Sequence, residues 1–515
     1  MPRSAKLALV LLLLVAVHAA AQAPVRVVVN ADLGTTTISR HIYGQFGEDL
    51  GRLIYDGFWT KTDSGPWHLR DDVIESLRRI RVPNLRWPGG CFSEYYHWRD
   101  GIGPVRDRRP MAVVIRGGVV EDNSFGTHEY LELVQRLGAD AFIVGNVGGG
   151  TVEEMTEWWQ YLTAPAGPLA DERARNGHPA PFTVPFWGVG NENWGCGGDM
   201  SAQTYAAVYR RYAEFLRTSG NTRAFRIAAG GNGTGEEAEA LDWMETMMRE
   251  AGPAMDGLDL HYYTVVGPWA HKGSATDFGE REWFTAMQRT ERMDTLIARS
   301  STIMDRYDPQ KRVWLIIGEW GMWHDPEPGT NPRFYQQQNT MRDAVVAGLH
   351  LNIFNSHADR VRMANLAQAV NVLQSVILTH GDTMIVTPTY WVFDLYKVHQ
   401  DATLLPLDIK SDAYTFDGQS VPAVSASASK DRDGRIHISL VNLDPNRGRT
   451  VRVEIRGQQV SSVSGRILTA ATMQAHNTFD QPDAVQLVDF REGRLSRGIL
   501  TLDLPSKSVV VVELR

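Results

Sequence analysis

The chain has 515 residues, of which 43% are hydrophobic and 22% are charged. Its length leaves room for roughly two to four domains, and its apolar content is enough for a large buried core. The formal net charge is −8, without long runs of one sign, so neither nucleic acid nor an anionic membrane is expected as a partner. A neutral polymer or a small neutral ligand fits this composition better.

The first residues have the pattern of a secretory signal peptide. Arg3 and Lys6 precede an apolar run of 11 residues from Leu7 to Val17, and small residues follow. Such a run is too short to cross a bilayer as a stable anchor. We expect cleavage after Ala21, with Ala23 as the alternative site, and export to a periplasm or the medium. An uncleaved anchor is the competing interpretation.

From about residue 42 to residue 351, short apolar segments alternate with longer amphipathic stretches, as in parallel strands joined by crossover helices. Helices are expected at 127–137 and 152–162, with Trp158 and Trp159 at core spacing. Candidate strands end near Glu48, Trp87, Gly145, Glu192, Gly230, Tyr263, Glu319 and Phe354. These units predict an α/β fold, a (β/α)8 TIM barrel. A doubly wound open sheet is the alternative, but its G-x-G-x-x-G fingerprint is missing after the first strand.

After about Asp401 the sequence changes to alternating apolar and polar residues separated by turn signals such as Asp433-Gly434. This alternating pattern predicts a C-terminal antiparallel β-sandwich of the jelly-roll kind. An early strand near 25–31 is expected to join that sandwich. The predicted organisation is a signal peptide at 1–21, an N-terminal strand segment at 22–41, a barrel at 42–400 and a sandwich at 401–515.

Sequence motifs for several kinds of chemistry are missing. The 15 histidines show no ligand spacing, no H-E-x-x-H or C-x-x-C occurs, and no G-x-S-x-G nucleophile elbow is present. We therefore predict no metal and no cofactor. The two cysteines, Cys91 and Cys196, lie beside candidate site residues and could form one disulfide or remain free thiols, because sequence does not measure their separation.

Two glutamates follow apolar segments: Glu192 in Gly190-Asn191-Glu192 and Glu319 in Gly318-Glu319-Trp320. Strands of a barrel deliver catalytic groups at their carboxyl ends, and a carboxyl pair is the minimum equipment for hydrolysing a glycosidic bond. Glu192 suits the general acid, because aromatic neighbours would raise its pKa. Glu319 suits the nucleophile, with Arg86 and Tyr263 as candidates to keep it ionised.

An ordered series of segments resembles family 51 of the glycoside hydrolases, the α-L-arabinofuranosidases. It comprises Ile42–Arg52, Leu85–Phe92, Trp98–Pro104, Gly190–Glu192, Leu260–Tyr263, Gly318–Trp320 and Asn365–Asn371. The resemblance implies a retaining mechanism on the barrel, with Glu192 as acid/base and Glu319 as nucleophile. It also implies release of terminal arabinofuranosyl units from plant cell-wall glycans or oligosaccharides, and assembly as a homo-oligomer.

The same resemblance implies further site residues. Substrate contacts fall on Glu48, Cys91, Asn191, Tyr263, Gln368 and Trp323, and support for the nucleophile falls on Arg86 and His261. Structural roles are the alternatives for Glu48, Arg86, Gln368 and Trp323. The chain departs from the family pattern at Asp49 and Gln45, which puts leaving-group preference in doubt. A β-xylosidase, an endo-glucanase and a catalytically silent carbohydrate-binding protein remain the rival functions.

Overall fold

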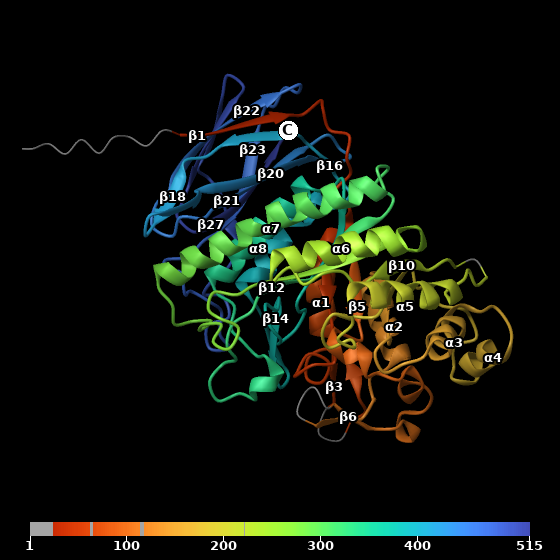
Figure 1. Cartoon of the computed structure of the whole chain (residues 1–515). Coiled ribbons are helices and arrows are strands. Elements are labelled where there is room, and N and C mark those ends of the chain that lie inside the picture. Colours follow the sequence, from red (N-terminus) through yellow and green to blue (C-terminus); the bar gives the residue numbers. More distant parts are fainter. Residues whose placement is uncertain (1–23, 62–64, 114–117, 221) are drawn as a thin grey trace, which may run out of the picture.

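The computed structural model describes residues 24–61, 65–113, 118–220 and 222–515. The predicted signal peptide at 1–21 lies outside the described residues. Figure 1 shows the two parts of the described chain: a barrel surrounded by helices, and a group of C-terminal strands that packs against one side of it.

Parallel strands close into a barrel at the centre of the first part. In circular order they are β2 (Gly44–Phe46), β5 (Asn84–Trp87), β8 (Asp140–Gly145), β9 (Phe186–Val189), β10 (Phe225–Ala228), β11 (Gly257–Thr264), β12 (Trp314–Met322) and β13 (Val361–Leu366). Pairing of Asn365 with Gly44 closes the ring between the last strand and the first. The strands are almost continuously buried, as expected for parallel strands covered on both faces. The predicted (β/α)8 barrel is confirmed, and the open sheet is excluded.

Helices cover the outside of the barrel (Figure 1). They are α1 (Asp71–Arg79), α2 (Thr127–Leu137), α3 (Val152–Thr163), α4 (Pro168–Arg175), α5 (Ala202–Phe215), α6 (Glu237–Ala251), α7 (Glu280–Tyr307), α8 (Met341–Ser356) and α9 (Pro388–Tyr396). The two helices expected at 127–137 and 152–162 are present as α2 and α3. Trp158 and Trp159 are buried, so their interpretation as core residues is confirmed.

The position predicted for the eighth strand is wrong. Phe354 lies in α8, and the eighth strand is β13, which begins at Val361. Helix α8 is buried from Met341 to Asn355, because it lies between the barrel and the C-terminal sheets. A helix that is buried on all sides has no solvent-facing polar stripe, so its sequence lacks a clear helical period and can resemble that of a buried strand.

The C-terminal part consists of two mostly antiparallel sheets that face each other across an apolar core. One sheet has the order β17 (Leu407–Lys410), β1 (Val25–Asn30), β22 (Arg449–Arg456), β26 (Ile499–Leu504), β25 (Gly493–Ser496). The other has the order β16 (Thr403–Leu404), β20 (Val424–Lys430), β21 (Ile436–Asn442), β27 (Ser508–Leu514), β23 (Val463–Leu468), β24 (Val488–Asp489). Strand β1 pairs in parallel with β22, so the start of the described chain lies in this layer. The predicted sandwich class is confirmed.

Short hairpins decorate both parts. They are β3 (Trp59–Thr60) with β4 (His68–Leu69), β6 (Met111–Val113) with β7 (Val119–Glu121), β14 (Ile377–His380) with β15 (Thr383–Val386), and β18 (Ala413–Phe416) with β19 (Gln419–Pro422). Within the described ranges, none of the helices combines the length and the apolar character needed to span a membrane.

Helix α8 connects the barrel to the sandwich through buried polar contacts. The Tyr43 hydroxyl donates to Asn355 Oδ1 at 2.8 Å, and Asn355 Nδ2 donates to the Ser427 hydroxyl on β20 at 3.2 Å. All three side chains are almost fully buried. Since a buried polar group without a partner is costly, these bonds favour a single arrangement of the two parts.

We expect Asn355→Ala to destabilise the protein. The substitution leaves the buried Tyr43 hydroxyl without its acceptor, at a cost of about 1–3 kcal/mol. Thermal unfolding followed by circular dichroism should show a lower midpoint for this variant. Asn446→Ala, in an exposed turn of the sandwich, is the matched control and should leave the midpoint unchanged. Equal midpoints for the two variants would contradict the importance of this interface.

Candidate active site

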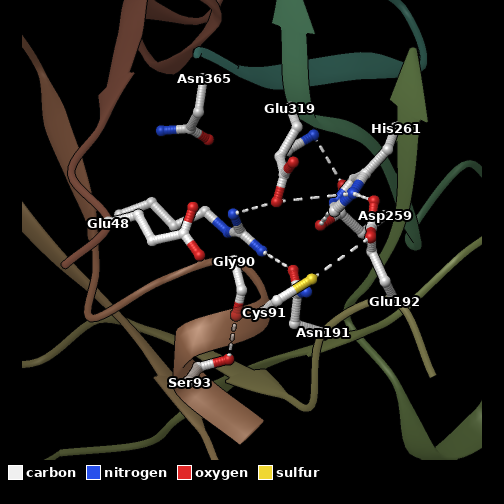
Figure 2. A network of polar contacts seen from close by, with 12 residues as sticks. Glu48, Gly90, Cys91, Ser93, Asn191, Glu192, Asp259, His261, Glu319 and Asn365 are labelled. Carbon is white, nitrogen blue, oxygen red and sulfur yellow. Dashed lines mark hydrogen bonds and ion pairs between the residues drawn. The ribbon is translucent and has the colours of Figure 1, made fainter. Parts of the chain in front are cut away.

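A cavity of about 380 Å³ opens at the carboxyl ends of the barrel strands. Eight of the residues singled out in the sequence line it: Glu48, Cys91, Glu192, His261, Tyr263, Glu319, Trp323 and Gln368. The other two, Arg86 and Asn191, lie directly behind this lining and hydrogen-bond to it or to each other. Figure 2 shows how side chains from several strand ends converge here. The barrel therefore gathers all ten residues in one place.

The two glutamates face each other across the cavity. Glu319 projects from within β12, whereas Glu192 lies just after β9 in a turn where its φ is 44°. A carboxylate oxygen of Glu192 lies within 4.8 Å of a carboxylate oxygen of Glu319. Carboxyl groups about 5–5.5 Å apart are typical of retaining glycosidases, and inverting enzymes need about 6.5–9.5 Å to admit a water. The spacing thus matches the retaining arrangement.

Glu319 is surrounded by donors. Arg86 Nη1 lies 2.8 Å from Glu319 Oε1, and the Tyr263 hydroxyl donates to Oε2 at 2.6 Å. The second guanidinium nitrogen of Arg86 donates to Asn191 Oδ1 at 2.6 Å, which fixes the plane of the arginine. Arg86 is 1% exposed, so its charge acts on Glu319 with little screening by water. These contacts favour an ionised carboxylate.

Glu192 has a different environment, centred on His261 (Figure 2). His261 Nδ1 lies 2.9 Å from Glu192 Oε1, and its distance to Glu319 Oε1 is 3.6 Å. The hydrogen bond of His261 is therefore with Glu192, although the sequence placed this histidine beside the nucleophile. On the other side of the ring, Nε2 lies 3.1 Å from Asp259 Oδ2.

Protonation states follow from these contacts. Burial would lower the pKa of His261, but the charges of Glu319 and Asp259 and the hydrogen bonds raise it to about 10, so the ring is a cation at neutral pH. Burial alone would raise the pKa of Asp259, and its contact with the His261 cation brings it below the usual value. Burial raises the pKa of Glu192, an effect that the hydrogen bond from His261 only partly offsets.

Asp259 was not identified from the sequence. It lies two residues before His261 on β11, and alternate residues of a strand point to the same side, so this spacing was an available signal. The Asp259 carboxylate also accepts from the backbone N–H of Gly318 at 2.6 Å. A Cβ at residue 318 would lie 2.2 Å from that carboxylate, so glycine is required beside Glu319.

Glu94 holds the turn that carries Glu192. This buried carboxylate accepts from the backbone N–H groups of Val147 at 2.7 Å and Gly148 at 2.6 Å, and from that of Asn191. Burial raises its pKa to about 7, even though these N–H bonds act in the opposite direction. No sequence pattern pointed to Glu94, because its partners come from strand ends distant in the chain.

Glu48 and Gln368 form a second polar pair in the cavity. Gln368 Nε2 donates to Glu48 Oε2 at 3.0 Å, and the Glu48 backbone N–H donates to Gln368 Oε1 at 3.1 Å. The N–H of Phe92 donates to Glu48 Oε1 at 3.1 Å. These bonds hold two side chains with exposed fractions of 4% and 1% in fixed orientations at the cavity wall.

Cys91 and Cys196 form a disulfide, which decides between the two alternatives left open by the sequence. Their sulfur atoms lie 3.8 and 3.6 Å from Glu192 Oε2. A disulfide sulfur has no proton to donate, so both sulfur atoms make van der Waals contacts with the Glu192 carboxyl group. The bridge joins the loop after β5 to the loop after β9.

Two groups of side chains bring three potential metal ligands together among the described residues: Cys91, Glu192 and Cys196, and Glu192, His261 and Glu319. In the first group the sulfurs are joined to each other and are not thiolates. In the second group the imidazole is protonated and bonded on both sides. A metal needs deprotonated ligands, so the chemistry of both groups opposes binding.

Several lining residues were missed by sequence reasoning. They are Leu50, Gly90, Asn232, Thr234, Trp269, Tyr335 and Leu373. Most of them come from loops after the strands, where no periodic pattern marks the side that faces the cavity. Trp194, two residues after Glu192, also lines it.

Comparisons with known proteins agree with this geometry. Two family models match: "Alpha-L-arabinofuranosidase 1 domain" over residues 76–281 and "Alpha-L-arabinofuranosidase C-terminal domain" over residues 318–508. The chain is 44% identical over 504 residues to an intracellular exo-α-L-arabinofuranosidase of Bacteroides ovatus, covering 97% of each protein.

Solved structures give the same result. The crystal structure of the GH51 arabinofuranosidase from Xanthomonas axonopodis pv. citri matches with a TM-score of 0.93 at 46% identity, covering 96% of this chain and 100% of that one. A family 51 α-L-arabinofuranosidase of Bifidobacterium longum matches with a TM-score of 0.84 at 25% identity, covering 96% and 100%.

These comparisons correct one prediction and confirm another. The predicted export is contradicted by the Bacteroides ovatus relative, whose name describes an intracellular enzyme. That prediction depended only on the composition of the first residues, which measures apolar character and not translocation. The resemblance seen in the motifs is confirmed: the chain belongs to glycoside hydrolase family 51, the α-L-arabinofuranosidases.

Proposed function

We propose that the protein is an exo-acting, retaining α-L-arabinofuranosidase that releases terminal non-reducing arabinofuranosyl units. The observation that carries this proposal is the pair of glutamates in one cavity with opposite environments. Glu319 is paired with Arg86 at 2.8 Å, whereas burial raises the pKa of Glu192. Acetal hydrolysis needs one charged and one neutral carboxyl group at the same pH.

In the first step, Glu319 attacks the anomeric carbon of the bound sugar while Glu192 gives its proton to the departing oxygen. The bond between the anomeric carbon and that oxygen breaks, and an ester between the sugar and Glu319 forms. Arg86 and Tyr263 release their hold on the carboxylate as its charge is lost. The aglycone leaves as a neutral alcohol.

In the second step, Glu192 acts as a base. It removes a proton from water, whose oxygen attacks the anomeric carbon from the side that the aglycone left, and the ester to Glu319 breaks. Two inversions at one carbon give net retention. Glu192 ends protonated and Glu319 ionised, so the site returns to its starting state.

Binding of the terminal sugar is assigned to polar residues in the cavity lining and to Asn191 directly behind it. We propose that Glu48, Asn191, Tyr263 and Gln368 bind hydroxyl groups, with Cys91 and Trp323 as apolar contacts. The fixed orientations of Glu48 and Gln368 support this role, because preorganised partners bind without an ordering cost. A cavity of about 380 Å³ suits a sugar unit and the start of its aglycone better than a long polymer chain, which supports exo action.

We further propose that the substrates are arabinose-containing glycans or oligosaccharides of plant cell walls. Residues 42–400 form the catalytic unit in this proposal, and residues 401–515 form the sandwich. The protein is also proposed to be a homo-oligomer. A Bifidobacterium longum relative, 27% identical over 90% of this chain and 91% of that protein, is named an exo-α-(1→6)-L-arabinofuranosidase, which supports the substrate class. Sedimentation analysis tests the oligomeric state.

Hydrolysis of aryl α-L-arabinofuranoside, compared with aryl β-D-xylopyranoside and a β-glucan, tests the proposed activity. We expect rapid release of aryl alcohol only from the arabinofuranoside. Preferred hydrolysis of the xyloside or the glucan would instead support a β-xylosidase or an endo-glucanase. A family 44 xyloglucanase of Paenibacillus polymyxa shares the fold at a TM-score of 0.60 and 11% identity, so the fold alone does not choose among these activities.

Substitution of the two glutamates should separate their roles. We expect Glu192→Ala to lower turnover of a glycoside with a poor leaving group by about 10²–10⁴-fold, because general acid catalysis is lost. Azide should restore activity with an activated aryl substrate and give an arabinofuranosyl azide of retained configuration. Glu319→Ala should lose almost all turnover, and any azide product should have inverted configuration. NMR spectra of the products distinguish the two outcomes.

The opposite pattern of configurations would exchange the two roles. Full activity of Glu319→Ala would refute the mechanism. Glu157→Ala, a substitution on α3 at a half-buried residue that pairs with Arg99 and does not line the cavity, is the control and should behave like the parent enzyme.

His261→Gln tests the control of Glu192 by its neighbour. The hydrogen bond and the charge of His261 both lower the pKa of Glu192, so their loss should raise that pKa. The acid must be protonated to act. A higher pKa therefore keeps it protonated to higher pH, and the alkaline limb of the kcat/KM profile should move upward.

The pH profile of kcat/KM with aryl arabinofuranoside provides the measurement. His97→Gln is the matched control, because His97 also contacts a glutamate, Glu154, at 2.8 Å, but lies at the surface. Its profile should not move. An alkaline limb that stays in place or moves downward in His261→Gln would show that His261 does not lower the pKa of the acid.

A further inference from the structure

We propose that Trp269 is the platform for the sugar unit on the leaving-group side of the scissile bond. The proposal rests on the arabinofuranosidase activity proposed above and extends it to the aglycone. The chemical class that such a platform binds is a neutral sugar ring, which stacks an apolar face on the indole. Trp269 would then determine how well the enzyme distinguishes glycan substrates from simple arabinofuranosides.

An aromatic wall leads from the nucleophile to the cavity mouth. Tyr263, which donates to Glu319, lies 4.9 Å from Trp323 between ring centroids, and Trp323 lies 5.0 Å from Trp269. The exposed fraction rises along this series, from 6% for Tyr263, through half-buried Trp323, to 57% for Trp269. All three side chains line the same cavity as Glu192 and Glu319.

An exposed tryptophan at this place needs an explanation. Water contact with a large apolar side chain is unfavourable, and 57% of Trp269 stays exposed despite its edge contact with Trp323 and the adjacent Lys272. The terminal sugar fills the inner end of the cavity, so the unit attached to it extends toward the mouth. A ring stacked there would cover the exposed indole.

Hydrogen bonds hold the loop that carries Trp269 in one conformation. The N–H of Gly267 donates to the Lys272 carbonyl at 3.1 Å, which closes the loop. The N–H groups of Lys272 and Gly273 donate to the two carboxylate oxygens of Asp325 at 2.9 and 3.1 Å. A Cβ at residue 267 would lie 2.0 Å from the His271 carbonyl oxygen, so the tight turn requires glycine.

Lys272 completes the support. Its Nζ lies 4.5 Å from the ring of Trp269 and 5.1 Å from that of Trp323, and it donates to the Trp269 carbonyl at 2.8 Å. The cation therefore joins both indoles and holds them at the edge of the cavity. An ammonium group has three donors, and it can offer a hydrogen bond to a hydroxyl of a ring stacked on Trp269.

Two substrates with alkyl leaving groups test the proposal: an α-L-arabinofuranosyl disaccharide and methyl α-L-arabinofuranoside, which has no aglycone ring. Arabinose release is measured for both. We expect Trp269→Ala to lower kcat/KM on the disaccharide by about tenfold. The same variant should change kcat/KM on the methyl glycoside less than about twofold, because that substrate does not reach the platform.

Conservative and control variants sharpen the result. Trp269→Phe keeps a stacking face and should recover most of the loss on the disaccharide. Phe215→Ala removes another exposed aromatic side chain, at the end of α5 and outside the cavity lining, and should leave both rates unchanged.

Equal losses on both substrates, or no loss on either, would overturn the role of Trp269. The underlying activity has its own test in the parent enzyme, which must release aryl alcohol from aryl α-L-arabinofuranoside. Failure there refutes the proposed function, whereas normal activity with an unselective Trp269→Ala variant refutes only the platform.

Discussion

Charge balance among buried groups at the centre of the barrel governs the site. Arg86 contacts the Glu319 carboxylate, and the His261 cation contacts the carboxylates of both Asp259 and Glu319. A negative charge on Glu192 would be buried among these groups, and burial raises the pKa of its carboxyl group although His261 and Arg86 act in the opposite direction. An unpaired buried charge is expensive. Burial therefore favours the neutral form of Glu192, which is the form that a general acid requires.

Each of the two cations, Arg86 and His261, makes directed contacts on two sides. Arg86 reaches Glu319 and Asn191 with separate nitrogens, so one guanidinium orients a carboxylate and the neighbour of the other glutamate. His261 uses both ring nitrogens, one toward Asp259 and one toward Glu192. A lysine in either position would give a charge without these directed pairs. Because each cation is shared, a change at one glutamate alters the field at the other.

The barrel was predictable because its strands combine short apolar runs with turn signals, and the glutamates were predictable because they end such runs. The eighth strand was misplaced because α8 is buried on all sides and has no polar face to reveal its period. The disulfide could not be predicted, since separation of 105 residues in sequence says nothing of distance in space. Residues such as Glu94 and Trp269 depend on loop conformation, which a periodic pattern does not encode.

A four-residue turn, Cys91–Glu94, links the separate parts of the site. Cys91 is joined to the loop after Glu192, the N–H of Phe92 orients Glu48, and Glu94 binds the backbone at Asn191. One short segment thus positions Glu192, the polar pair of Glu48 and Gln368, and the turn at Asn191. Groups coupled through a shared support do not contribute additively, so losses measured for single substitutions around this turn should overlap instead of summing. The site is therefore better regarded as a single unit centred on this turn than as independent catalytic and binding residues.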